Sequence, residues 1–175
     1  ELGALYHKQG RLAEAQAMLE QAVAVSPHDF ASRYHLALVY LDQGRLDDAE
    51  QMLDAITRQS LVTLFHSHLF DPELYATWVR FYQARGDTVQ MIDAQRKIAM
   101  IRGAPTDYLA MAALHRQLGQ PQQAVEQCNR AADALLRTWP RPLASELWEI
   151  AICLVQSGED EPQLAIHDSQ SEIRN

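Results

Sequence analysis

The sequence predicts an all-α fold, an α-solenoid in which antiparallel helix pairs stack one after another. The first observation is self-similarity at an offset of 34 residues within a chain of 175. Nine positions are identical when residues 1–20 are aligned with residues 35–54: Leu2/Leu36, Tyr6/Tyr40, Gln9/Gln43, Gly10/Gly44, Arg11/Arg45, Leu12/Leu46, Ala15/Ala49, Met18/Met52 and Leu19/Leu53. The second observation is that each copy carries apolar residues at helical spacing on both sides of a glycine. Repetition at this period is typical of helical units that bury their apolar faces against one another.

The first unit shows the pattern of each pair. Leu2, Leu5 and Tyr6 share one helical face, and Gly10 follows as the residue that tolerates the positive φ of a helix end. Apolar residues at helical spacing then mark the second helix: Leu12, Ala15, Leu19 and Ala22. Pro27 ends the unit, because its ring cannot continue an α-helix.

Later units are less regular than the first. We expect four to five helix pairs, in units near residues 1–29, 30–70, 71–104, 105–141 and 142–158, followed by an acidic C-terminal cap or tail at 159–175. The third unit has Met91 where the first two have alanine, and the fourth has His115 where the others have tyrosine. The fifth shows only a first helix, from Pro142 to Gln156.

The second unit contains an insertion. Its turn glycine, Gly44, lies 42 residues before Gly86 rather than 34, which places eight extra residues within 58–70. Its second helix is therefore expected to run on for several turns. The insertion is rich in apolar residues: Leu61, Val62, Leu64, Phe65, Leu69 and Phe70. These residues either pack locally against an elongated helix or form a second interface, with Leu61, Leu64, Phe65 and Phe70 exposed to a partner or a second copy.

The clearest helix start follows this insertion, at Asp71, Pro72 and Glu73. Asp71 is predicted to be the N-cap, Pro72 the first helical residue and Glu73 an acid in the first turn.

Composition and charge exclude several classes of protein. The 47 % apolar content is ordinary for a folded chain, and no stretch approaches the ~20 consecutive apolar residues of a membrane-spanning helix. The net charge is −8, and Lys8 and Lys97 are the only lysines. Nucleic-acid binding is not expected, since it requires clustered basic residues.

No catalytic, cofactor or metal site is predicted. His66 and His68 would point to opposite sides of a helix, so they could share a metal only on a strand. Cys128 and Cys153 lie in apolar helical contexts and are predicted to be small, unpaired core residues. The glycines lie at turns between helices and form no phosphate-binding loop.

The order of key residues in the first unit resembles that of the tetratricopeptide repeat. It reads Leu2-Gly3, Tyr6, Gly10, Ala15, Ala22 and Pro27. The resemblance covers about residues 1–158 and implies a right-handed superhelix with a protein-binding groove along its first helices. In chaperone-binding members, two Lys, two Asn and one Arg grip a terminal carboxylate. The matching places in units two to four hold no cation, so this clamp is not expected: Tyr34, Leu38, Thr77, Thr106 and Ala110.

The resemblance also implies which residues line the groove. These are the predicted partner-binding residues: Tyr34, His35, Leu38, Leu41, Thr77, Arg80 and Arg116. An apolar and aromatic strip followed by two guanidinium groups suits an extended or helical segment with an acidic end. The alternative is that the leucines pack on the next helix and both arginines are solvated.

The predicted function is a non-catalytic scaffold that binds a protein or peptide partner, as part of a larger protein or assembly. Two alternatives remain. The chain is a self-assembling module, such as a homodimer joined through 58–70, or it is an array that regulates or tethers an enzyme domain outside this sequence. Arg- and Gln-rich, Lys-poor usage is typical of a bacterial protein, cytoplasmic or periplasmic.

Overall fold

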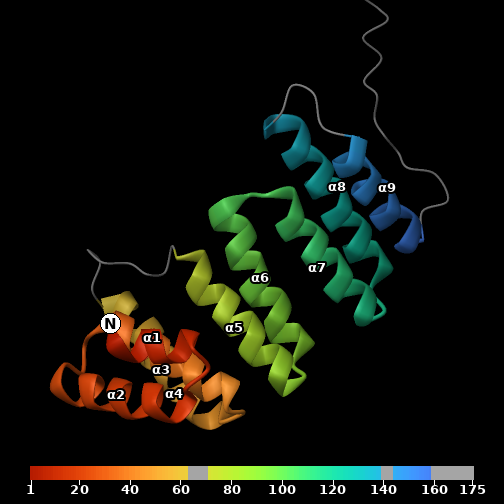
Figure 1. Ribbon diagram of the computed structural model, residues 1–175. Helices are drawn as coiled ribbons and strands as arrows, with labels where there is room; N and C mark the ends of the chain where they lie inside the picture. Colours follow the sequence, from red (N-terminus) through yellow and green to blue (C-terminus); the bar gives the residue numbers. More distant parts are fainter. Residues whose placement is uncertain (63–70, 139–143, 159–175) are drawn as a thin grey trace, which may run out of the picture. The chain divides into compact units, whose positions relative to one another are not determined.

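The computed structural model describes residues 1–62, 71–138 and 144–158. Within these ranges the chain forms nine helices and no strand (Figure 1), which confirms the predicted all-α fold. The helices are α1 (Leu2–Lys8), α2 (Leu12–Val25), α3 (Phe30–Asp42), α4 (Leu46–Val62), α5 (Pro72–Arg85), α6 (Thr88–Arg102), α7 (Pro105–Gln117), α8 (Pro121–Thr138) and α9 (Ala144–Gln156). Their contacts divide the chain into two compact units, Glu1–Gly103 and Ala104–Asn175.

Four helix pairs share one kind of turn. α1/α2, α3/α4, α5/α6 and α7/α8 pack as neighbours, and a glycine with φ between 67° and 75° ends the first helix of each. In the second pair the N–H after Gly44 donates to the carbonyl of Tyr40 at 2.8 Å. The residue after the glycine makes the same bond in the other three pairs. This closure requires a left-handed residue, so glycine marks each turn.

The core of the first unit contains small residues where paired helices meet. Ala15 and Ala49 are fully buried, as are the larger Leu53 and Phe81. Gly3 shows how close the helices of the first pair come, because a Cβ atom there would lie 2.5 Å from Leu19 Cγ.

The second unit has its own core, in which α9 packs on α8 and α7. The buried cluster contains Ala112, Ala124, Cys128, Ala131, Leu135, Ile150, Cys153 and Leu154.

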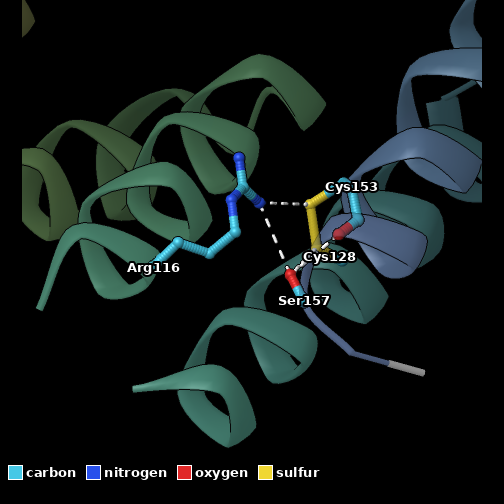
Figure 2. The surroundings of a disulfide bond; sticks show 4 residues. All are labelled: Arg116, Cys128, Cys153 and Ser157. Atoms are coloured by element: carbon cyan, nitrogen blue, oxygen red, sulfur yellow. Dashed lines mark hydrogen bonds between the residues drawn. A yellow bond between two sulfur atoms is a disulfide. The ribbon is translucent and has the colours of Figure 1, made fainter. Parts of the chain in front are cut away.

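The prediction that Cys128 and Cys153 are unpaired is wrong. They form a disulfide that joins α8 to α9 (Figure 2). Their Cα atoms are 6.0 Å apart, within the range that a disulfide spans. A separation of 25 residues on two different helices gave no sequence signal, since only helix packing brings these positions together.

The helix start at Asp71 is confirmed. Its side chain accepts a hydrogen bond from the Glu73 N–H at 2.9 Å, and Pro72 is the first residue of α5. α4 extends to Val62, and residues 63–70 lie outside the described part of the chain. The second interface therefore stays a prediction: Leu64, Phe65 and Phe70 are not described, nor is the side chain of Leu61.

None of the described helices is both long and apolar enough to cross a bilayer. The described residues also contain no group of three or more His, Cys, Asp or Glu that could hold a metal ion. His66 and His68 lie outside the described ranges.

Candidate functional site

A polar network crosses the first helices of three successive pairs. α3 contacts both α1 and α5, and Asp42, in the last turn of α3, bonds to both neighbours. Its Oδ2 accepts from His7 Nε2 at 2.7 Å, and its Oδ1 accepts from Arg80 Nη2 at 2.7 Å. We call His7, Asp42 and Arg80 the Asp42 network.

The network holds Asp42 in its ionised form. Partial burial alone would raise the pKa of the Asp42 carboxyl, but the hydrogen bonds from His7 and Arg80 outweigh this effect and lower it below its usual value. The Arg80 side chain nevertheless keeps 52 % of its surface exposed, and that of Asp42 keeps 34 %. Both charges are therefore within reach of a ligand that lies along these helices.

Tyr34 and Thr77 also connect α3 to α5. Thr77 is buried, donates to the Glu73 carbonyl at 3.0 Å and lies 3.2 Å from the Tyr34 hydroxyl. The Tyr34 ring is half-buried and stacks on Phe30 at 5.8 Å between ring centroids. Thr77 therefore orients Tyr34 and offers little surface of its own.

His35 faces a cavity of about 490 Å³ between α1, α2 and α3. The cavity is lined by Glu1, Ala4, Leu5, Lys8, Leu19, Asp29, Ala31, Ser32 and His35. Burial lowers the pKa of His35, and the nearby charges of His7 and Lys8 lower it further. Its Nδ1 is buried and has no hydrogen-bond partner among the described residues. His35 thus borders this cavity as a neutral imidazole whose Nδ1 is shielded from solvent.

The remaining predicted residues divide between the two units. Leu38 and Leu41 are half-buried on α3, and Leu41 packs against the core of the first unit. Arg116 belongs to the second unit, where its Nη1 lies 3.6 Å from Cys153 Sγ and 3.4 Å from Ser157 Oγ (Figure 2). Its guanidinium is half-buried beside the disulfide.

We use the name first-helix face for the following residues of α1, α3 and α5: His7, Tyr34, His35, Leu38, Leu41, Asp42 and Arg80. Sequence reasoning missed His7 and Asp42. Asp42 lies two residues before its turn glycine, whereas Arg80 lies six before Gly86. Asp42 and Arg80 therefore occupy different positions in the aligned repeats, although the long arginine side chain brings their charged groups into contact.

The comparisons with known proteins agree with the architecture. Residues 6–61 match the family model of the tetratricopeptide repeat, which confirms the predicted resemblance for that part of the chain. A search of curated proteins found no significant match.

Several solved structures share the fold. A putative kinesin light chain of Podosopora anserina with nearly identical TPR-like repeats superposes with a TM-score of 0.66 at 24% identity, over 90% of this chain and 84% of that one. Two structures of MamA superpose with TM-scores of 0.64 and 0.62 at 14% and 13% identity. These alignments cover 89% and 90% of this chain and 79% and 92% of the respective MamA chains. At such identities the likeness establishes a fold of stacked helix pairs.

Proposed function

We propose that this chain, which carries tetratricopeptide repeats at residues 6–61, is a non-catalytic scaffold whose first-helix face binds a segment of a partner protein. Repeat arrays present long surfaces formed by successive units, which suit extended or helical peptides. The proposed partner segment carries an acidic group for Arg80 and apolar side chains for Leu38 and Leu41.

The observation that carries this proposal is the exposed arginine of the Asp42 network. A guanidinium that is already oriented by one carboxylate can donate to a second carboxylate, because Arg has five N–H donors in a fixed fork. Asp42 holds Arg80 through Nη2. A partner carboxylate can therefore bind Arg80 without the entropy cost of ordering the long arginine side chain.

Affinity capture with the purified chain, followed by titration of the captured partner, tests this proposal. Arg80→Glu should weaken binding by about 1.5–3 kcal/mol, or roughly 10- to 150-fold, through loss of a charge-assisted contact. Circular dichroism should show the helical content unchanged, since exposed ion pairs contribute little to stability.

Arg96→Glu is the matched control. Arg96 has the same side-chain exposure of 52 % and is also paired with an aspartate, Asp93, but this pair lies within α6. Both variants thus place a glutamate beside an aspartate on the surface. Equal binding by the two variants would exclude the first-helix face as the binding site.

A further inference from the structure

The Cys128–Cys153 disulfide lies in the core of the second unit and has a cation against one of its two sulfurs. Both cysteines are buried, with 0% and 4% of their surfaces accessible. The Arg116 guanidinium reaches the bridge from α7, and its Nη1 lies 3.6 Å from Cys153 Sγ (Figure 2). A disulfide sulfur is uncharged and a weak hydrogen-bond acceptor. The same contact would be much stronger with a negatively charged sulfur.

Arg116 has no carboxylate beside it among the residues that the structure describes. Its other hydrogen bond goes to the neutral hydroxyl of Ser157, at 3.4 Å. A half-buried guanidinium without a counter-ion is unfavourable, because burial removes part of the water that hydrates the charge. An anion at Cys153 would supply this counter-ion.

The two sulfurs differ in their surroundings. Cys128 Sγ lies 3.8 Å from the Ser157 hydroxyl, and the described residues place no cation against it. The Ser157 hydroxyl donates its single proton to the Cys153 carbonyl at 2.7 Å, so this proton is not available to either sulfur. Arg116 is therefore the group that distinguishes Cys153 from Cys128.

Two features oppose a negative charge at Cys153. Burial disfavours a charged group, and Cys153 lies in the last turn of α9, where the helix carbonyls carry partial negative charge. The helix end is equivalent to only about half a charge, spread over several carbonyls. The full charge of Arg116 in contact with the sulfur outweighs it.

No other charged side chain contacts the bridge in the described part of the second unit. On α7, Asp107 and Tyr108 lie near the start of the helix, and His115 bonds to Gln120 at 2.8 Å. The remaining charged residues of α8 and α9 whose side chains are described are exposed: Glu126, Arg130, Asp133, Arg137 and Glu149. The charge state of Cys153 in a reduced chain therefore depends mainly on Arg116.

We propose that the Cys128–Cys153 bridge is a reversible redox switch, in which Arg116 stabilises the reduced chain by pairing with Cys153 as a thiolate. Reduction removes the covalent link between α8 and α9, so that packing alone then holds α9 on its neighbours. The switch lies within the second unit and does not involve the first-helix face, so either proposal can fail without the other.

The co-reactant is a dithiol. One of its thiolates attacks Cys128 Sγ, the S–S bond breaks, and the electron pair goes to Cys153 Sγ, which leaves as the thiolate beside Arg116. The second thiolate of the reductant then closes the reductant's own disulfide, and Cys128 leaves and takes up a proton. The dithiol loses two electrons and two protons. The bridge gains two electrons and one proton, and the other proton goes to water. Because both sulfurs are buried, the attack requires a local opening of α9.

A redox titration of the full chain with reduced and oxidised dithiothreitol tests the proposal, with the reduced fraction measured by alkylation and mass spectrometry. Arg116→Gln should lower the equilibrium constant for reduction about five- to tenfold at pH 9, because an adjacent Arg favours an anion by about tenfold or more. It should leave the constant unchanged at pH 6, where both cysteines are thiols. Comparison of two chains at the same pH cancels the ionisation of the reagent.

Two variants serve as controls. Arg130→Gln removes the same charge from the second unit at a residue that pairs with Glu126 within α8, so it should leave the constant unchanged at both pH values. Arg116→Lys keeps the charge and should retain most of the wild-type value at pH 9. Circular dichroism of the oxidised form checks that each variant is folded.

A second measurement does not depend on the Arg116 variants. The ultraviolet absorbance of thiolates gives the pH at which a single cysteine ionises. Cys128→Ala, which keeps Cys153, should form its thiolate at a lower pH than Cys153→Ala, which keeps Cys128.

Four results would overturn the proposal. The first is an equal loss in Arg116→Gln at pH 6 and pH 9, which would show that Arg116 only supports packing. The second is an equal loss in Arg130→Gln at pH 9. The third is ionisation of Cys128 at the same pH as Cys153 or below it. The fourth is a bridge that excess dithiothreitol does not reduce in the folded chain, or that does not form again when the dithiol is removed.

Discussion

Removal of the Cys128–Cys153 disulfide should strongly destabilise the second unit. The bridge closes a loop whose ends lie 25 residues apart in sequence. In the chain-entropy account, a crosslink stabilises by restricting the unfolded chain, and for a loop of this length the effect is about 3.5 kcal/mol at 25 °C. A domain is commonly stable by only ~5–15 kcal/mol. Loss of the bridge should therefore remove a large share of the stability of residues 104–158.

The assay compares the oxidised protein with Cys128→Ala/Cys153→Ala and with the wild-type chain in reductant. With a urea slope of about 1 kcal/mol per molar for a small domain, the unfolding midpoint of the second unit should fall by roughly 3.5 M. Hydrogen exchange resolved by peptide should show lost protection in α8 and α9 and unchanged protection in α3 to α6. This difference is expected because a repeat array transmits stability mainly between neighbours.

Two controls test this reasoning. Reductant should add nothing to the effect of the double substitution. The reasoning is refuted if alkylation in denaturant without reductant labels two thiols, because the bridge would then be absent. It is also refuted if reduction leaves the protection of α8 and α9 unchanged.

Two further predictions concern the first unit. Ala49→Leu should destabilise it by about 1–3 kcal/mol in urea unfolding, because Ala49 is fully buried between paired helices and a larger side chain overpacks the contact; a neutral result would show that the helices can separate at this point. Stability should also fall as the pH is lowered from 7 towards 5, because burial lowers the pKa of His35 and the folded chain then binds fewer protons than the unfolded one. His35→Gln should reduce this dependence, whereas His28→Gln, at an exposed position, should not; urea midpoints at both pH values measure the difference.

The sequence predicted the features that depend on local chemistry. Gly44 and Gly86 mark turns because their backbone conformation excludes most other residues, and Asp71 marks a helix start because its carboxylate caps a free N–H. Ala15 and Ala49 occupy the same position in two repeats, and this recurrence of a small residue predicted a close contact between paired helices.

Other features depend on packing in three dimensions. The Cys128–Cys153 disulfide and the Asp42–Arg80 pair each join different helices, and their sequence separations carry no periodic signal. Thr77 was correctly placed on a helix but is buried, and its hydroxyl donates to a carbonyl four residues earlier in the same helix. Periodicity identifies the face on which a residue lies, but not the partner that its side chain takes.

Asp42 should constrain the evolution of two other positions, because residues of two different helices bond to its carboxylate. His7 and Arg80 are 73 positions apart in the sequence, and each bonds to its own oxygen of this one carboxylate. Replacement of Asp42 leaves His7 and Arg80 without their acceptor, whereas replacement of either of them leaves the other pair intact. A substitution at position 42 should therefore relax the constraint on both neighbours at once, so that positions 7 and 80 tend to vary together, through position 42, among descendants of this chain.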